Sequence, residues 1–263
     1  MKFKSVFKYI FSILIIFSFA CSQIERDNIL DPKNNSSSRE SVLLLEAFIN
    51  TSDNVPQNYT FNYDALEAID SLSDIYGDRL IWLEYHWNTS NSNYYDPFTL
   101  AMGEDQYTKY TTGFDLSRSK GVPDIFINGA ENRVQGASNV SNVIKRTQVF
   151  ASDLIVQPSQ FTIETEFDAL SDKIEGTYLI AGLGNKQTDE MLMRIVLTDN
   201  NGLKGKRTVR AMSIPDPVDK IDAGEFVEKD FTLEFDGFNP DNIIFILMDE
   251  NGNEVLHAIE KEL

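Results

Sequence analysis

The chain has 263 residues, 41 acidic and 23 basic side chains, and a formal net charge of −18 at pH 7. A polyanion of this size is repelled by phosphate backbones, which excludes nucleic acid as an expected partner. The single cysteine, Cys21, excludes a scaffold of disulfides. With 42% hydrophobic residues, the chain can bury an ordinary core instead.

The first 20 residues have the pattern of a secretory signal. Three lysines precede an apolar run over residues 9–19, which is too short to span a bilayer stably. Ala20-Cys21 closes this run in the manner of a bacterial lipobox. We therefore expect residues 1–20 to be a lipoprotein signal peptide and Cys21 to carry the lipid anchor. The alternative is an uncleaved helical anchor at the N-terminus.

Residues 21–40 are polar, rich in Asn and Ser, and without apolar periodicity, which predicts a disordered tether. Ser22 does not resemble the aspartate that retains some lipoproteins at the inner membrane. We therefore expect the protein at the outer membrane, held by its lipid and facing the periplasm or the cell surface.

The next elements predict a strand, a helix and a second strand. Residues 42–49 are a short apolar run, and residues 79–86 return to strand character. Between them, residues 51–63 read as a loop, and Asp64 is positioned to cap a helix over 65–77. This order is typical of a βαβ unit with a parallel strand pair.

A second group of elements follows. The segment 97–114 is expected to be partly helical, residues 121–123 form a turn, and residues 125–127 form a strand. Asn128-Gly129 is a hairpin signal. Residues 138–150 have apolar side chains at the spacing of an amphipathic helix.

From Leu154 onward the pattern changes to short β-prone runs separated by turn signals, such as residues 199–202 and 250–253. Closely spaced strands of this kind are typical of an all-β sandwich. The sequence therefore predicts an α/β domain over residues 41–151 followed by a β-sandwich domain, Ig-like or Greek-key, over residues 153–263.

Several short motifs resemble one family. VLLLEAF, IYGDRLIWLEYH, YYDPF, GVPDIFINGA and the C-terminal IIFILMDENGNEVLHAIEKEL resemble the thioredoxin-like outer-membrane lipoproteins of the twenty-eight-kilodalton outer-membrane protein family. The resemblance implies a thioredoxin-like fold for the α/β domain. It also implies a Cys-x-x-Cys pair after the first strand, facing a proline in the cis form. Pro123, preceded by Val122, matches that proline, but residues 49–63 contain no cysteine.

Without a thiolate there is no disulfide exchange, so the resemblance does not carry an oxidoreductase activity or a cofactor to this chain. What remains is a groove beside the proline, where an extended peptide could pair as an added strand. We expect a binding or assembly role, with an envelope protein or peptide as partner. The candidate groove residues are Val122, Pro123, Asn54 and Tyr59.

A second candidate surface is the loop from Trp87 to Tyr95. Trp87, Tyr94 and Tyr95 lie there among asparagines and serines, a composition typical of recognition surfaces. The alternative is a long loop that packs its own aromatic rings.

Catalysis and metal binding find little support. His86, at the end of a predicted strand, could serve a hydrolase as general base, but no nucleophile-elbow pattern accompanies it and a structural histidine is expected. The two histidines are far apart, so we expect no metal centre. Residues 249–254 could chelate calcium, but a plain hairpin turn explains them. The remaining alternative is a purely structural envelope lipoprotein.

Overall fold

The computed structural model describes residues 40–52, 56–88, 95–113, 121–183, 190–200 and 207–263, apart from the side chains of 56–60. The helical elements are α2 (Pro56–Tyr76), the 3-10 turn η1 (Gly77–Arg79), α3 (Ala101–Gly113) and α4 (Val140–Leu154). The strands are β1 (Leu43–Ile49), β2 (Leu80–His86), β3 (Asp124–Ile127), β4 (Asn132–Gln135), β5 (Phe161–Ala169), β6 (Lys173–Gly182), β7 (Met191–Asp199), β8 (Thr208–Met212), β9 (Asp216–Val218), β10 (Phe226–Glu234), β11 (Asn242–Asp249) and β12 (Val255–Glu262).

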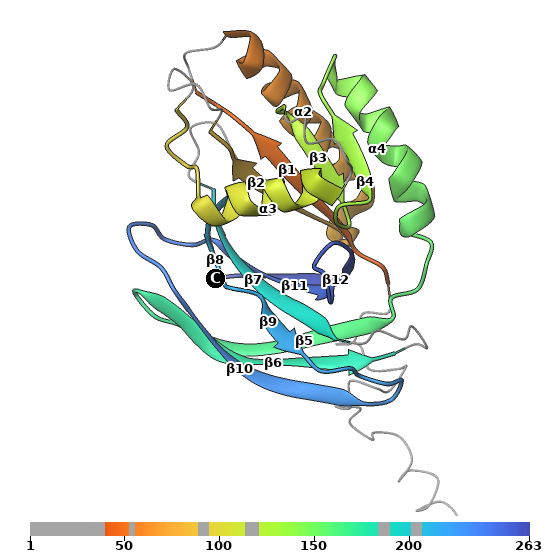
Figure 1. Ribbon diagram of the computed structural model, residues 1–263, viewed down its shortest axis with the longest axis vertical. Coiled ribbons are helices and arrows are strands. Elements are labelled where there is room, and N and C mark those ends of the chain that lie inside the picture. The colour runs from red at the N-terminus through yellow and green to blue at the C-terminus, as the bar shows by residue number, and fades with distance from the viewer. Residues whose placement is uncertain (1–39, 53–55, 89–94, 114–120, 184–189, 201–206) are drawn as a thin grey trace, which may run out of the picture.

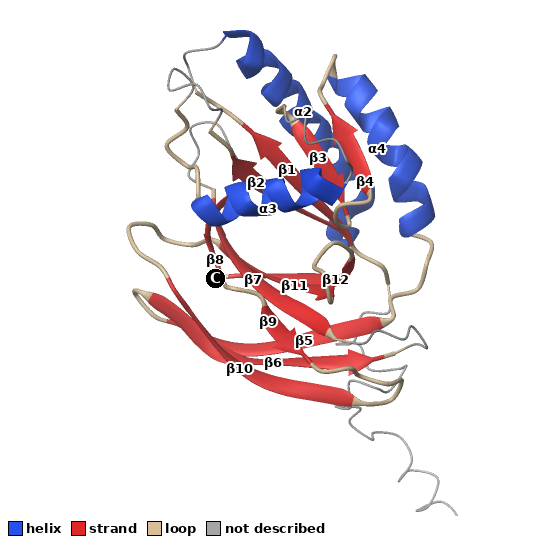
Figure 2. Cartoon of the chain, in the orientation of Figure 1, coloured by secondary structure: helices blue, strands red, loops and turns tan. Residues whose placement is uncertain are grey.

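The described strands form a mixed nine-stranded sheet and a three-stranded sheet (Figures 1 and 2). The larger sheet has the order β12-β11-β7-β8-β2-β1-β3-β4, with β9 paired to β7. The smaller sheet has the order β10-β6-β5 and is antiparallel throughout. Strands from both halves of the sequence therefore share the larger sheet.

The predicted βαβ unit is confirmed. β1 and β2 are parallel, with Leu43 opposite Leu80, and α2 connects them. The predicted hairpin is also confirmed, because β3 and β4 pair in antiparallel fashion around Asn128 and Gly129. Both turn residues have positive φ angles, 50° and 99°, which suits Asn and Gly and few other residues.

The predicted start of the first helix is wrong. α2 begins at Pro56, well before Asp64, so most of the expected loop over residues 51–63 is helical. Proline is favoured at the first helical position, where its missing N–H leaves no hydrogen bond unmade. The polar and aromatic residues that follow Pro56 therefore belong to the helix, although apolar residues at helical spacing occur only in its later part.

Alternation along two long strands explains the layers of the fold. On β7 and β11 the odd-numbered side chains pack against the three-stranded sheet, and the even-numbered side chains pack toward α3. Ile244 and Ile246 of β11 thus lie in the same core as Phe48 of β1. At the other end of the large sheet, α2 and α4 cover the face opposite to α3 (Figure 1).

The expectation of an α/β thioredoxin-like domain followed by a separate all-β sandwich domain is wrong. β7, β8, β11 and β12 extend the sheet that contains β1–β4, through the parallel pairing of β2 with β8 at Glu84 and Thr208. Close to this junction, the Glu84 N–H donates to the Arg207 carbonyl at 3.1 Å. The alternation of apolar and polar residues predicts where each strand lies in the sequence. It does not predict which other strand is its neighbour in the sheet.

Two further contacts join the halves. The tip of the β3–β4 hairpin meets the β11–β12 turn, where the Ala130 N–H donates to the Asn253 carbonyl at 2.7 Å. Inside the core around α3, Arg194 of β7 lies 3.9 Å from the Glu46 carboxylate of β1. Both side chains are buried, so this ion pair links the two halves through the interior.

Among the described residues, none of the helices combines the length and the apolar character that crossing a bilayer requires.

Candidate functional site

The candidate site lies where β1 and β2 end and β3 begins. These strands meet at one edge of the sheet because β1 is parallel to β2 and antiparallel to β3. Phe48 is opposite Asp124 in the last pair of the β1–β3 ladder. Residues 50–52 therefore leave the sheet, and residues 121–123 enter it, at the same edge.

The segment 50–52 is held at each residue. The Asn50 N–H donates to Asn62 Oδ1 at 3.3 Å, and Asn62 Nδ2 donates back to the Asn50 carbonyl at 2.7 Å. Asn50 Nδ2 reaches the Trp87 carbonyl at 2.9 Å, and its Oδ1 accepts from the Ser52 N–H. These bonds fix the backbone in the region where the related pattern would place a thiol pair, with amide and hydroxyl side chains instead of sulfur.

His86, at the end of β2, is part of a buried polar cluster that includes Thr51 of this segment and Asp96. We call these three residues the His86 clamp. His86 Nδ1 is 2.8 Å from Asp96 Oδ2, which also accepts from the Thr51 N–H at 2.8 Å and from Thr51 Oγ1 at 3.1 Å. On its other side, His86 Nε2 lies 3.8 Å from Glu84 Oε2. The clamp thus connects the ends of β1 and β2 with the loop that contains Asp96.

Burial of His86 would lower its pKa, but the hydrogen bond to Asp96 and the charges of Asp96 and Glu84 outweigh it and raise the pKa to about 9. Burial likewise opposes the charged form of Asp96, yet the hydrogen bond and charge of His86 hold the pKa of that carboxyl below its usual value. At pH 7, therefore, His86 is a buried imidazolium between two carboxylates. A ring that already carries its proton is poorly suited to act as a general base.

The turn before β3 is held by a second cluster. The Tyr107 hydroxyl accepts from the Gly121 N–H at 3.0 Å and donates to Asp124 Oδ2 at 2.9 Å. Arg133 Nε donates to Asp124 Oδ1 at 2.8 Å, and Arg133 Nη2 donates to Oδ2 of the same carboxylate at 2.5 Å. This bidentate pair and the tyrosine position the turn from both ends.

The peptide bond between Val122 and Pro123 is cis, as the resemblance implied. Pro123 is buried, and its carbonyl accepts from the Gly136 N–H at 2.8 Å. Val122 is half-buried. Within the described part of the chain, its backbone N–H and carbonyl have no hydrogen-bond partner. The turn therefore presents one residue with free backbone groups at the edge of the sheet where the fixed segment 50–52 also lies.

Of the other predicted site residues, several lie outside what the structure describes: Cys21, Asn54, Tyr94 and the side chain of Tyr59. Trp87 is half-buried, and its ring packs edge-on against Tyr107 at 5.3 Å between centroids, so it belongs to the core around α3. Tyr95 is 66% exposed. The structure thus separates Trp87 from Tyr95: one ring supports the site, and the other faces solvent.

Sequence reasoning missed the partners that hold the site, namely Thr51, Asp96, Tyr107, Asp124 and Arg133. His86 is expected from the sequence to be a structural histidine, and Asp96 belongs to the YYDPF motif, but neither observation indicates that the two side chains meet. The described residues contain no group of three His, Cys, Asp or Glu side chains placed to hold a metal ion.

No family model matches the chain, and no curated protein matches it. Among solved structures, HBP35 of Porphyromonas gingivalis is similar over 86% of this chain and 76% of the solved chain, with a TM-score of 0.60 and 14% identity. Protein AGR_C_4864 from Agrobacterium tumefaciens is similar over 85% of this chain and 95% of its own, with a TM-score of 0.51 and 17% identity. At these identities the likeness shows the fold alone.

Proposed function

We propose that the protein is a redox-inactive lipoprotein of the outer membrane, a member of the twenty-eight-kilodalton outer-membrane protein family, that holds an extended segment of a partner. Cys21 would carry the lipid and the polar residues after it would act as the tether. The partner would be an envelope protein or peptide. No catalytic step is part of the proposal, because the chain has no cysteine besides Cys21.

The observation that carries the proposal is the turn at Val122. Its N–H and carbonyl are the groups that an extended peptide uses to add itself as a strand, and neither is satisfied within the described residues. The turn is also rigid, because Tyr107 and Asp124 hold its two ends. A preorganised backbone binds more tightly, since less conformational entropy is lost on binding.

Lipidation can be tested directly. We expect the full-length chain, produced in a diderm bacterium and fed an alkyne-labelled fatty acid, to incorporate the label and to fractionate with the outer membrane. The variant Cys21→Ala should lose the label, because no other thiol can accept the diacylglyceryl group. Ser22→Ala, one residue away, should keep it. Label on Cys21→Ala would contradict the proposed anchor.

The groove can be tested by photocrosslinking in the intact envelope. A benzophenone amino acid at Val122 should give a discrete crosslinked species, because a bound segment would lie against this half-buried residue. The same group at Val149, which is 66% exposed on α4, is the matched control and should give none. Equal yields at both positions would contradict the groove. Disulfide reduction by the purified chain would contradict the redox-inactive part of the proposal.

One observation favours the purely structural alternative. Asn50, Thr51 and Ser52 are all buried and hydrogen-bonded, so this side of the site has little freedom to adapt to a ligand. A lipidated protein that gives no crosslink at Val122 would support this second function. The fatty-acid label on Cys21 and the crosslink at Val122 therefore test the lipid anchor and the binding role separately.

A further inference from the structure

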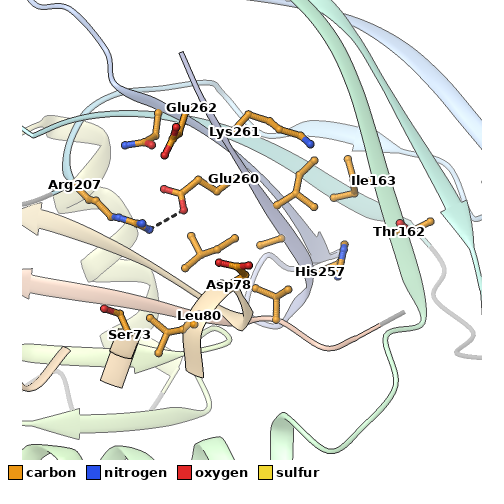
Figure 3. Close-up of a pocket in the computed structure, with 16 residues that line it drawn as sticks. Ser73, Asp78, Leu80, Thr162, Ile163, Arg207, His257, Glu260, Lys261 and Glu262 are labelled. Carbon is orange, nitrogen blue, oxygen red and sulfur yellow. Dashed lines mark hydrogen bonds and ion pairs between the residues drawn. The ribbon is translucent and has the colours of Figure 1, made fainter. Parts of the chain in front are cut away.

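The end strands of the two sheets border one cavity of about 620 Å³ (Figure 3). Residues 257–262 of β12, the end strand of the large sheet, line it together with residues 162–163 of β5, an end strand of the small sheet. A second cavity, of about 380 Å³, lies between residues 163–166 of β5 and Lys261 of β12. Because the two cavities share Ile163 and Lys261, they form one space between the strands, which we call the edge slot.

The edge of β5 that β6 does not cover presents backbone groups without partners. The Leu183 N–H donates to the Gln160 carbonyl at 2.8 Å, in register with the β5–β6 ladder. In an antiparallel ladder, residues that bond the neighbouring strand alternate with residues whose N–H and carbonyl point away from it. The even-numbered residues of β5 therefore bond β6, and the backbone groups of Ile163 and Thr165 point to the free edge. Within the described part of the chain these groups have no hydrogen-bond partner.

The edge of β12 that β11 does not cover is free in the same way. The Leu263 N–H donates to the Asp241 carbonyl at 3.0 Å, in register with the β11–β12 ladder. By the same alternation, the backbone groups of Ala258, Glu260 and Glu262 point away from β11. The described residues provide no partner for them. A strand edge of this kind is where an extended segment adds itself by main-chain hydrogen bonds.

The charge of the edge slot selects the partner. Six carboxyl groups line the two cavities: Asp78, Glu164, Glu166, Glu228, Glu260 and Glu262. The basic groups of the lining are Arg207, which already bonds Glu260 at 2.8 Å, and Lys261, which extends from β12 toward β5 (Figure 3). A second copy of this chain, with a net charge of −18, would be repelled. A segment with lysine or arginine side chains complements this lining.

Alternation along β5 defines where those side chains would lie. Glu164 of β5 and Glu228 of β10 are both opposite Leu179 of β6, so the two carboxylates lie on the same face of the small sheet. Ile163 lies on the other face, in the core against β7 and β11. A strand added beside β5 alternates its side chains between the same two faces. Its basic residues would therefore meet the carboxylates, and its aliphatic residues would continue the apolar face.

We propose that the edge slot binds an extended segment of a partner polypeptide in which lysine or arginine alternates with aliphatic residues. The segment pairs its backbone with the free strand edges and directs its cationic side chains to the carboxylates. Val42 and Leu80 of the lining place the slot at the amino ends of β1 and β2, whereas the Val122 turn lies at their carboxyl ends. This site does not rest on the proposed function.

The test uses the full-length chain in neutral detergent and a fluorescent, capped heptapeptide of alternating lysine and valine. We expect this peptide to bind by fluorescence anisotropy and to slow hydrogen exchange in residues 161–169 and 255–262, measured by mass spectrometry. Two control peptides should bind more weakly by about tenfold or more. One has glutamate in place of lysine and loses the charge complementarity. The other is methylated on every backbone nitrogen and loses the N–H donors.

Reversal of two charges of the slot provides the matched variants. Glu164→Lys combined with Glu166→Lys should weaken binding of the lysine peptide by about tenfold or more, because two attractions become repulsions. The fold should be retained, since neither side chain is buried. The control is Glu67→Lys combined with Asp153→Lys, at exposed positions of α2 and α4. This control changes the net charge equally and should weaken binding by less than about twofold, because its charges are distant and screened.

Four results would overturn the proposal. The first is absence of binding by the lysine peptide, and the second is equal binding by the methylated peptide, which cannot pair as a strand. The third is equal loss of affinity in the two double variants, which would mean that net charge alone attracts the peptide. The fourth is protection from exchange confined to the Val122 turn, which would place the peptide in the other groove and leave the proposed function standing.

Discussion

Replacing Arg194 by Met is expected to lower the free energy of unfolding by about 3–5 kcal/mol, because it leaves the buried Glu46 carboxylate without its counter-ion. Arg194 is 3% exposed, and its second nitrogen donates to Gln106 of α3 at 2.8 Å. Burial raises the pKa of Glu46, while the charge of Arg194 and the 2.5 Å hydrogen bond from Tyr110 oppose that rise. Without the arginine, the carboxylate must be buried unpaired or take up a proton.

Urea unfolding measures this effect through the midpoint and slope of the transition. The matched control is the double variant Glu46→Leu with Arg194→Met, which removes both charges and should recover most of the lost stability. A single substitution that costs less than about 1 kcal/mol would show that the pair does not hold the two halves of the sheet together. A double variant as unstable as the single would show that packing volume, not charge, is decisive.

Replacing His86 by Leu is expected to cost about 3 kcal/mol at pH 7, since Asp96 and Glu84 lose the cation between them. The folded pKa of His86, about 9, exceeds the ordinary value of 6.5, so folding favours the charged ring. The stabilisation is therefore complete below pH 6.5 and is lost as the pH rises through about 9. Its full size corresponds to about 3 kcal/mol, at roughly 1.4 kcal/mol for each pH unit.

The measurement is the free energy of unfolding between pH 6 and pH 10, for the wild type and for His86→Leu. The difference between the two should shrink across the alkaline part of this range. His257→Leu is the matched control. Burial lowers the pKa of His257 to about 4, so the stability that depends on its titration changes only between about pH 6.5 and pH 4. His257 therefore makes no contribution to the pH dependence in the alkaline range. A difference that stays constant up to pH 10 would mean that His86 is neutral in the folded protein.

Local patterns predicted most of the individual elements. The apolar run of β1, the periodicity of α2 and the strand character of β2 correctly indicated a parallel βαβ unit. Asn128-Gly129 correctly indicated the β3–β4 hairpin, because its positive φ angles suit few other residues. These elements depend on residues that are close together in the chain, so the local sequence pattern is sufficient to predict them.

The partners of the site residues could not be predicted in this way. Asp96 belongs to the YYDPF motif, but nothing in that motif indicates its hydrogen bond with His86, and Tyr107 reaches Asp124 of β3 from helix α3. Arg194 and Glu46 are separated by most of the chain, yet they meet inside one core. Nothing in the spacing of these residues indicates their contact, since it arises only when β7 joins the sheet of β1.

The amino-acid composition by itself determines that this chain has no thiol pair for disulfide exchange, because Cys21 is its only cysteine. This holds for any fold. Tertiary structure decided the architecture, by extending one sheet from β4 to β12 instead of closing two separate cores. The physical reason is that a strand's backbone forms the same hydrogen bonds with any neighbour. Which neighbour it takes depends on the packing of side chains that are distant in sequence.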